Sequence, residues 1–461
     1  MLVCVAIAIL LFFVLSAAGV IGTHKVSDLN TLAELLDGTA QPGDQIEVEP
    51  GTYYLDRPRL LVTSSGTPEA PIIVRGVEEN GSKPVICASR THVQNGIFFF
   101  PPETHDVILE NFELRSAQGD GRGFEQVFSR NAAGVFLQGS NITVRNCHIH
   151  GCENGQMATE DADFILVENC NIGNNGRLEH RRGDGTPLNP HRTHNFYFSA
   201  RRQIVRHCYI HNSLDGVDFK SRGHNTIFAF NWVEEDMYSS MGIASHNQQN
   251  TLCLGNVAVK RTYQVQDAPA AQRSLLRIGN GTGVACGKVV ALNNTFVTCF
   301  PHDYQLFSID SATTDVVFIN NAFAGPGESF MIHSGSGTIT GTNNWIATVA
   351  GDLPSSLENK IRGDDPGFVD RDGFDFRPRE DSPLLDAGAS QEEYMKALRL
   401  VTQHSRGDGG AGPSPVYLEA VADVEKPYPA HQPACRAPGF LPRRVERRMD
   451  IGAYQSTGVS R

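Results

Sequence analysis

The sequence lacks a long apolar segment after its first 22 residues, which excludes a membrane-spanning helix from the remainder of the chain. Positive charge is scarce: 39 Lys and Arg against 51 Asp and Glu give a net charge of −12. The chain as a whole therefore repels nucleic acids and anionic membranes. Cysteine and histidine show no spacing typical of a zinc site. One of the ten cysteines, Cys4, lies in the apolar N-terminal run, and the remaining odd number leaves at least one thiol unpaired.

The N-terminal run from Leu2 to Gly22 carries no charged side chain and turns polar at Thr23. Small residues at 16–19 favour a secretory signal peptide over residues 1–22. No Lys or Arg precedes the run, and an uncleaved anchor is the alternative at a length of about 20 residues. We expect a secreted, extracellular and monomeric protein that is free of the membrane once the signal is cleaved.

A short apolar stretch that ends in Asn, once in His, recurs along the middle of the chain. The nine terminal residues are Asn111, Asn146, Asn169, His207, Asn231, Asn256, Asn294, Asn321 and Asn344. Most of the spacings are 23–27 residues, and the longer ones, of 35 and 38 residues, fit a coil with an inserted loop. A strand–turn–strand unit repeated at this length predicts an architecture of stacked coils.

Stacking would let each asparagine hydrogen-bond to its counterpart in the next coil, and asparagine tolerates the left-handed backbone that such turns require. We therefore interpret these asparagines as scaffold. Cys147, Cys170 and Cys208 each follow a repeat residue, so stacking would place their side chains in one packed column.

The sequence predicts three parts after the signal. In residues 23–70, Ser27 can cap a short helix that ends at Gly38 and covers the open end of the first coil. Residues 71–347 form the coils. Residues 348–461 form a closing segment, in which the Gly- and Pro-rich stretch 406–444 is expected to be irregular.

Three motifs accompany the repeat: Pro42-Gly-Asp with Pro50-Gly-Thr-Tyr, Ser382-Pro-Leu-Leu-Asp-Ala-Gly, and Asp450-Ile-Gly-Ala-Tyr. Together they resemble secreted right-handed parallel β-helix proteins of the pectin-lyase-like superfamily. That superfamily contains pectate, alginate and chondroitin lyases, polygalacturonases, uronan epimerases and phage tailspikes. The resemblance implies an all-β, single-stranded, right-handed parallel β-helix (a solenoid) with a short N-terminal capping helix. Because this fold carries many activities, the site has to come from the residues.

Strand alternation predicts a column of polar side chains on one outer face of three successive coils. Val217 and Phe219 would point inward, and the residues between and after them outward. The residues expected on the outer face are Tyr197, Lys220 and His246, with His194, Asn195, Asp218 and Arg222 beside them. Between Arg177 and Arg222 there are nine Lys or Arg against four Asp or Glu, which indicates an anionic ligand.

These residue types suit β-elimination of a uronate polysaccharide, which needs a neutralised carboxylate, a base for the adjacent C–H proton and an acid for the leaving oxygen. We assign Lys220 as the base, with a pKa lowered by Arg222 and by burial. Arg222 would neutralise the carboxylate, and His246 or Tyr197 would act as the acid. His194, Asn195 and Asp218 would bind substrate.

No residue is assigned as a metal ligand, but a Ca²⁺ ion that neutralises the carboxylate remains an open alternative. Its ligands would come from the acidic residues of neighbouring coils. These are Glu160, Asp161, Asp163, Asp215, Glu234, Glu235 and Asp236.

The window from Val217 to Asn256 looks like the part of the alginate and chondroitin B lyase family that carries a Lys-Ser strand, here Lys220-Ser221. This resemblance implies Lys220 as the base. In that family an arginine of an Arg-His-Gly stretch acts as the acid one coil later, whereas this chain has Ser-His246-Asn. The Gly-His-Gly and Arg-Ile-Lys stretches of polygalacturonases are absent. Asp364-Asp365 lies outside the coil strands, so hydrolysis by two carboxylates is not indicated.

We expect a carbohydrate-active protein that acts on or binds an acidic, uronate-containing polysaccharide, with lyase-like β-elimination as the reaction. The alternatives are a non-catalytic glycan-binding or surface protein, and a uronan epimerase that shares the proton-abstraction step. A groove in which Tyr197, Lys220 and His246 converge would favour an enzyme, whereas a flat and solvated column would favour binding.

Overall fold

The computed structural model describes residues 22–426 with several gaps. The described ranges are 22–88, 92–116, 131–176, 193–214, 216–235, 240–243, 249–261, 274–279, 287–299, 305–309, 314–325, 329–333, 337–351, 353–406 and 412–426. The expected signal peptide therefore lies outside the described residues. Among the residues described, no helix is long and apolar enough to cross a lipid bilayer.

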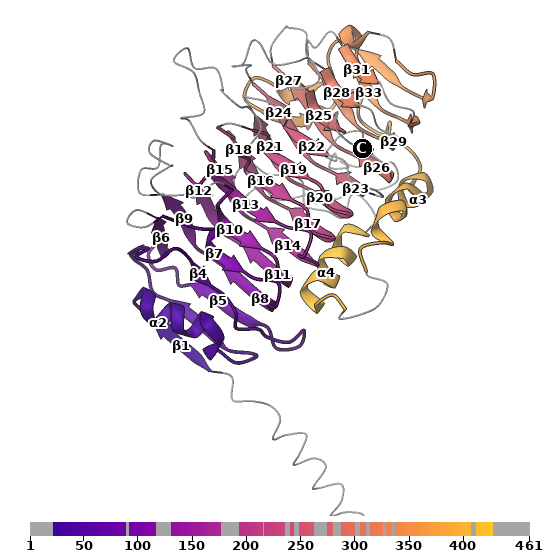
Figure 1. Cartoon of the computed structure of the whole chain (residues 1–461). Coiled ribbons are helices and arrows are strands. Elements are labelled where there is room, and N and C mark those ends of the chain that lie inside the picture. Colours follow the sequence, from indigo (N-terminus) through magenta and orange to yellow (C-terminus); the bar gives the residue numbers. More distant parts are fainter. Residues whose placement is uncertain are drawn as a thin grey trace, which may run out of the picture.

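Nearly all described strands belong to three parallel sheets that run along the molecule (Figure 1). Sheet A contains, in spatial order, β1 (Thr23–Val26), β2 (Gln45–Val48), β5 (Ile72–Gly76), β8 (His105–Glu110), β11 (Ser140–Arg145), β14 (Ile165–Glu168), β17 (Arg202–Arg206), β20 (Asn225–Ala229), β23 (Gln249–Leu254), β26 (Gly287–Leu292), β29 (Asp315–Ile319), β32 (Ile339–Thr342) and β34 (Leu357–Glu358).

Sheet B contains β3 (Thr52–Tyr54), β6 (Val85–Ala88), β9 (Glu113–Ser116), β12 (His148–His150), β15 (Asn171–Gly173), β18 (Tyr209–His211), β21 (Trp232–Glu235), β24 (Val257–Lys260), β27 (Thr295–Thr298), β30 (Ala322–Ala324), β33 (Trp345–Ala347) and β35 (Ile361–Gly363). Sheet C contains β4 (Leu60–Leu61), β7 (Gly96–Phe100), β10 (Ala133–Leu137), β13 (Asn154–Ala158), β16 (Phe196–Phe198), β19 (Phe219–Ser221), β22 (Met241–Ile243), β25 (Ser274–Ile278), β28 (Gln305–Ile309) and β31 (Ser329–His333). A separate antiparallel pair joins β36 (Phe368–Asp370) to β37 (Asp375–Pro378).

Each coil visits the sheets in the order C, A, B, as β7, β8 and β9 do, and the next coil pairs with it in register. Parallel pairing begins at Thr23 and continues to Gly363, so it includes the first strands as well as the coils expected at 71–347. Alternate side chains of every sheet point into one continuous apolar core, where Phe296 stacks on Phe323 of the next coil. The coils thus bury one face of each sheet without needing a second domain.

The turn from sheet A to sheet B contains two stacked positions rather than one. The first position has a left-handed backbone and is occupied by Asn111, Asn146, Asn169, His207, Phe230, Gly255, Asn293, Asn320 and Asn343. The next position points inward and is occupied by Phe112, Cys147, Cys170, Cys208, Asn231, Asn256, Asn294, Asn321 and Asn344. The sequence repeat aligned the first four members with the last five, and the structure shifts the last five by one residue.

Both roles expected of asparagine are confirmed, but by different residues. Asn111, Asn146 and Asn169 adopt the left-handed backbone, with φ of 54–66°. From Asn231 onward the inward asparagines form a ladder, in which Asn256 Nδ2 donates to Asn294 Oδ1 (2.9 Å) and Asn294 Nδ2 to Asn321 Oδ1 (2.9 Å). Asn256 and Asn294 also donate to the backbone carbonyls of Phe228 and Cys253, near the ends of sheet A strands, so the ladder ties the turn to the sheet.

The expected column of cysteines is present. In the earlier coils these cysteines occupy the same inward position that asparagine occupies in the later coils. Cys147, Cys170 and Cys208 are buried free thiols, and the backbone N–H of Cys208 donates to Asn231 Oδ1 (3.0 Å). Burial raises the pKa of the Cys147 and Cys170 thiols well above the ordinary value. Cys147 and Cys170 are therefore protonated packing residues rather than nucleophiles.

A short helix, α2 (Leu29–Glu34), covers the first coil as expected (Figure 1). The cap residue is Asp28 rather than Ser27: its Oδ1 accepts from the backbone N–H groups of Asn30 (2.9 Å) and Thr31 (3.0 Å). The carboxylate is preferred because it satisfies two backbone donors at once. A wider turn, η1 (Leu35–Thr39), ends the helix, and η5 (Thr348–Ala350) is a single turn near the other end of the coils.

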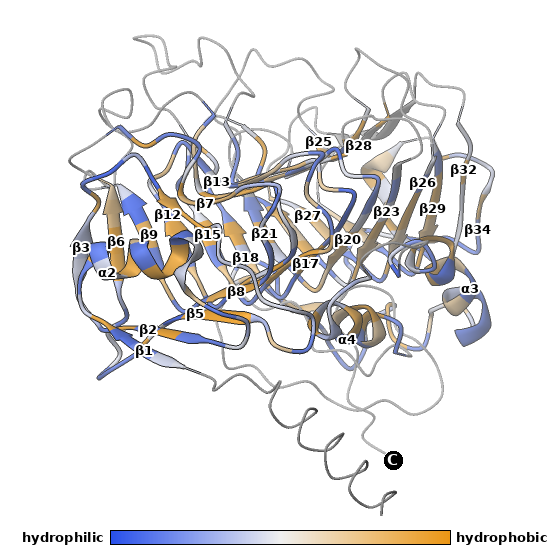
Figure 2. Ribbon diagram, turned by 60° about the horizontal axis from the view of Figure 1, so that its bottom comes forward, coloured by the Kyte–Doolittle hydropathy of each residue, from blue (hydrophilic) through white to orange (hydrophobic). Residues whose placement is uncertain are grey.

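Two C-terminal helices, α3 (Gln391–Thr402) and α4 (Pro415–Val424), cover the outer face of sheet A (Figures 1 and 2). The helix α4 lies inside the stretch expected to be irregular, so that prediction is wrong for these ten residues. Ser414 caps α4, and Pro415 occupies its first turn, where a missing N–H costs nothing. Its apolar face buries Tyr417 against Phe164 of sheet A.

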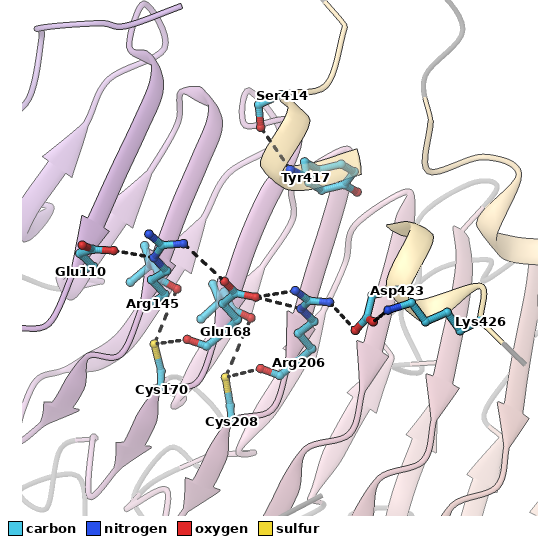
Figure 3. A network of polar contacts seen from close by, with 12 residues as sticks. Glu110, Arg145, Glu168, Cys170, Arg206, Cys208, Ser414, Tyr417, Asp423 and Lys426 are labelled. Carbon is cyan, nitrogen blue, oxygen red and sulfur yellow. Dashed lines mark hydrogen bonds and ion pairs between the residues drawn. The ribbon is translucent and has the colours of Figure 1, made fainter. Parts of the chain in front are cut away.

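A column of alternating charges joins sheet A to α4 (Figure 3). Arg145 lies between Glu110 and Glu168, and Arg206 donates to Glu168 through Nη2 (2.7 Å). Arg206 Nη1 then pairs with Asp423 of α4 (2.9 Å). Burial opposes the ionisation of Glu110, but the hydrogen bonds and charges of Arg75 and Arg145 outweigh it and hold its pKa below the ordinary value. This column is structural, because every charge in it has a partner.

Candidate functional site

The outer face of sheet C carries the column expected from strand alternation. Tyr197 of β16 pairs in register with Lys220 of β19, which pairs with Gly242 of β22, which pairs with Arg277 of β25. The neighbouring positions Phe196, Phe198 and Phe219 are buried, as expected for the inward face. We call Tyr197, Lys220, Gly242 and Arg277, with Arg222 beside them, the basic column.

Lys220 occupies the centre of the basic column. Its side chain is half-buried, and Nζ lies 5.3 Å from the centre of the Tyr197 ring. The Arg222 guanidinium lies 5.5 Å from the same ring centre. Burial, followed by the charges of Arg222 and Arg277, lowers the pKa of Lys220 to about 8. Among the described residues no ion pair joins Lys220 to a carboxylate, and the charges that lower its pKa are those of Arg222 and Arg277.

Arg277 was missed by the sequence analysis. Strand alternation alone places Arg277 on the outer face, with Leu276 and Ile278 inward. The sequence does not show that Arg277 aligns with Lys220, because a long inserted segment separates β24 from β25. Between Lys220 and Arg277 the column has Gly242, and a Cβ there would meet nothing closer than 3.7 Å. Gly242 therefore places no side chain between the two cationic residues.

Asp218 and Asn195 do not face outward, and this part of the prediction is wrong. Both are fully buried, and Asn195 Nδ2 donates to Asp218 Oδ1 (2.6 Å). Asp218 Oδ1 also accepts from the backbone N–H of Ser213 (3.1 Å), and Asn195 Oδ1 accepts from Asn175 Nδ2 (2.8 Å). The reason is that β16 and β19 begin one residue later, so strand alternation does not extend to these two positions. They hold the turn that leads into sheet C.

His194 is buried and stacks against Tyr197. The two rings stack with centres 5.4 Å apart and an angle of 18° between their planes. His194 is buried, and its Nδ1 accepts from the backbone N–H of Val217 (3.1 Å). Gly216 permits this contact, because a Cβ there would lie 2.4 Å from His194 Nδ1. His194 thus fixes the orientation of the Tyr197 ring.

His246 lies outside the described residues, within the gap 244–248. In the part of the coil that is described, Met241 and Ile243 are buried as expected, and Gly242 takes the register position beside Lys220. The structure therefore brings Tyr197, Lys220 and Arg222 together and leaves the assignment of His246 as a prediction.

An apolar column continues the basic column toward the N-terminus on the same face of sheet C. Phe99, Phe136 and Met157 occupy successive positions in register with Tyr197. The rings of Phe99 and Phe136 meet edge to face at 5.7 Å, and the Arg59 guanidinium lies 5.3 Å from the Phe99 ring centre. The outer face therefore changes from apolar to cationic at Tyr197, a change that the sequence analysis did not detect.

Two of the acidic residues considered for Ca²⁺, Glu234 and Asp163, are already paired with donors in the structure. Glu234 of sheet B is buried and accepts from Trp232 Nε1 (2.8 Å) and the Tyr209 hydroxyl (3.2 Å). Asp163 precedes β14 of sheet A and pairs with Arg202. These two carboxylates lie on different sheets and already have donors. Asp215 and Asp236 lie outside the described residues.

Comparison with known proteins agrees with the architecture. The family described as right handed beta helix region matches residues 95–258. The chain is a right-handed parallel β-helix. This fold, with its short N-terminal helix, is the one that the repeat and the terminal motifs predict. No curated protein sequence matches the chain.

Solved β-helix structures resemble this one at low sequence identity. Pectate lyase Pel9A is 14% identical over 80% of this chain and 93% of its own, with a TM-score of 0.47. A PL6 family polysaccharide lyase from Pseudopedobacter saltans is 12% identical over 74% and 91%, with a TM-score of 0.42. An alginate lyase from Paenibacillus sp. str. FPU-7 is 14% identical over 73% and 99%, with a TM-score of 0.41. These activities are those of the matched proteins, and the chemistry of this β-helix rests on its own side chains.

Proposed function

We propose that this β-helix is a carbohydrate-active protein that binds an acidic, uronate-containing polysaccharide along the outer face of sheet C and cleaves it by β-elimination. The observation that carries the proposal is Lys220, whose pKa is lowered to about 8 between Tyr197, Arg222 and Arg277. At neutral pH about a tenth of such lysines are uncharged and able to accept a proton. Three cationic side chains on one sheet face also suit a polyanion.

Each part of the basic column has a place in the reaction. Arg222 or Arg277 binds the uronate carboxylate, which acidifies the adjacent C5–H and stabilises the charge that develops there. The neutral Lys220 amine takes the C5 proton, the C–H electron pair forms the C4–C5 double bond, and the C4–O bond breaks. The leaving oxygen takes a proton from an acid, for which Tyr197 is the described candidate and His246 the alternative. Lys220 ends the step protonated and returns its proton to water.

Two other functions use the same surface. A non-catalytic glycan-binding protein needs only the cationic side chains, and it is favoured by the absence of a described carboxylic acid beside Lys220. A uronan epimerase shares the removal of the C5 proton but returns a proton to the opposite face of the sugar. The apolar column of Phe99, Phe136 and Met157 adjoins all three versions of the site.

The test is incubation with alginate, pectate and glycosaminoglycans, followed by ultraviolet absorbance of the unsaturated uronate product. We expect product from at least one polymer, and a loss of at least about 100-fold in Lys220→Ala, the low end of the contribution of a general base. The matched control is Lys288→Ala on sheet A, whose partner is Asp315 (3.6 Å). No product from any uronan, with binding that survives in Lys220→Ala, would contradict the proposal. Deuterium incorporation at C5 without cleavage would identify the epimerase.

We also propose that residues 1–22 direct secretion and that the mature protein is monomeric. N-terminal sequencing of protein recovered from the culture medium of an expressing host should begin near Thr23. Light scattering coupled to size exclusion should give one chain per particle. An intact N-terminus in a membrane fraction would contradict secretion and support the anchor.

A further inference from the structure

A second cluster of chemically competent side chains lies on the outer face of sheet B. His148 and His150 are two residues apart on β12, so both point outward while Ile149 is buried between them. Glu113 of β9 pairs in register with His148. His150 Nε2 lies 3.2 Å from Glu113 Oε1, and the two imidazole rings stack with their centres 4.3 Å apart.

These three residues supply three potential metal-ligand atoms within 4.8 Å of one another, the only such group of His, Cys, Asp or Glu among the described residues. We propose that Glu113, His148 and His150 form a binding site for a divalent transition-metal ion such as Zn²⁺. Two imidazoles and one carboxylate are a common donor set for this class of metal. All three side chains are half-buried, so each is accessible to solvent while its neighbours restrict its motion.

The separation of two of the three ligand atoms is already that expected around a bound ion. Two ligand atoms about 2.1 Å from one ion are about 3.2 Å apart when the angle at the ion is about 100°. This is the separation of His150 Nε2 and Glu113 Oε1. The donor atom of His148 already lies within 4.8 Å of both, and rotation of its half-exposed ring can bring it to the ion.

Two neighbouring cationic side chains, Arg115 and Lys83, oppose the binding of a metal by charge repulsion. Their positions determine how much the affinity is lowered. Arg115 Nε lies 3.1 Å from Glu113 Oε1, and Lys83 Nζ donates to the backbone carbonyl of Asn146 (3.2 Å). The contacts of Arg115 and His150 with Glu113 both use Oε1, so the carboxylate has a second oxygen for the metal or for Arg115. The site is therefore weakened rather than blocked, and we expect micromolar rather than nanomolar affinity.

The site is separate from the basic column, because the two lie on different sheets of the β-helix. Its ligands come from two successive coils, β9 and β12, so a bound ion cross-links neighbouring coils. Binding to the folded chain alone raises its stability in proportion to the logarithm of the free metal concentration. With three protein ligands, the remaining coordination positions are left to water or to an anionic ligand.

The experiment measures metal binding to the full chain after treatment with a chelator. Equilibrium dialysis against Zn²⁺ gives the stoichiometry and affinity, and the visible absorption of bound Co²⁺ reports nitrogen and oxygen coordination. The ligand variants are His148→Ala, His150→Ala and Glu113→Gln. The matched control is His24→Ala, because His24 also pairs with a carboxylate, Asp44 (3.0 Å), but has no third ligand among the residues described.

We expect one equivalent of Zn²⁺ in the wild type and in His24→Ala, and at least about tenfold weaker binding in each ligand variant. Zn²⁺ should raise the thermal midpoint of the wild type and leave that of His150→Ala unchanged. If a histidine variant fails to fold, Glu113→Gln, which conserves the shape of the side chain, decides the question. Equal affinity in the wild type and all three ligand variants, or no Zn²⁺ retained by the wild type, would overturn the proposal.

Discussion

Arg206 of β17 donates from Nη1 to Asp423 of α4 over 2.9 Å, although the two residues are 217 positions apart in the sequence. Asp423→Ala removes this contact but leaves Arg206 bound to Glu168, so we expect a loss of about 0.5–1 kcal/mol in the free energy of unfolding. Tyr417→Ala should cost about 3–5 kcal/mol, because it empties a buried aromatic contact in the same interface. Chemical denaturation measures both. Equal losses would show that charge rather than apolar burial holds α4.

A buried glutamine gives a prediction of the opposite sign. Gln156 points into the core between the register positions of Val135 and Phe196, and neither of its amide atoms has a hydrogen-bond partner in the part of the chain that the structure describes. Gln156→Met should therefore raise the unfolding free energy by about 1–3 kcal/mol. The matched control is Gln203→Met, because Gln203 Nε2 donates to Ser221 Oγ and Thr226 Oγ1, both at 2.9 Å. The control should be destabilised, and destabilisation of both variants would show that Gln156 has a partner.

The asparagine ladder predicts that substitutions at the inward turn position destabilise the later coils more than the earlier ones. Asn294 donates to Asn321 and to the carbonyl of Cys253, and accepts from the side chain and backbone N–H of Asn256. We expect Asn294→Ala to cost about 3–5 kcal/mol, because it leaves several buried groups unsatisfied. Cys170→Ala, at the equivalent position of an earlier coil, should cost only about 1–2 kcal/mol, since a thiol packs but bonds weakly. Thermal and denaturant unfolding of the two variants provide the comparison.

The repeat predicted the stacked coils because spacing alone determines how many residues one coil contains. It could not assign the inward position, since asparagine suits both the left-handed turn and the ladder, and only the register from Cys208 to Asn231 separates the two. Asp218 was placed outward for a similar reason: the sequence does not show where β19 starts, and strand alternation does not apply to the turn residue before it. The helix α4 could not be predicted because its partner, the outer face of sheet A, is distant in the sequence.

The role proposed for Lys220 predicts how activity depends on pH. The base must be neutral, and the pKa of Lys220 is about 8, so kcat/KM should rise about tenfold per pH unit below 8 and level off above it. Arg277→Gln removes one of the positive charges that lower this pKa, so the inflection should move to higher pH. A pH–rate profile of the wild type and this variant, measured on the same polymer, checks the shift. An inflection that stays in place would show that another group titrates.

The lowered pKa also has a consequence for stability that needs no substrate. The folded pKa of Lys220, about 8, lies below its ordinary value of 10.5, so between these values the unfolded chain binds more protons than the folded one. The contribution of Lys220 to stability must therefore rise with pH across this window. Lys220→Met removes the titrating group, so the variant should be more stable than the wild type at pH 7 and lose this advantage toward pH 10.5. Residues that carry out chemistry are commonly retained although they lower the stability of the folded protein. A difference between the two proteins that does not change with pH would mean that the pKa is not lowered, and the assignment of Lys220 as the base would lose its support.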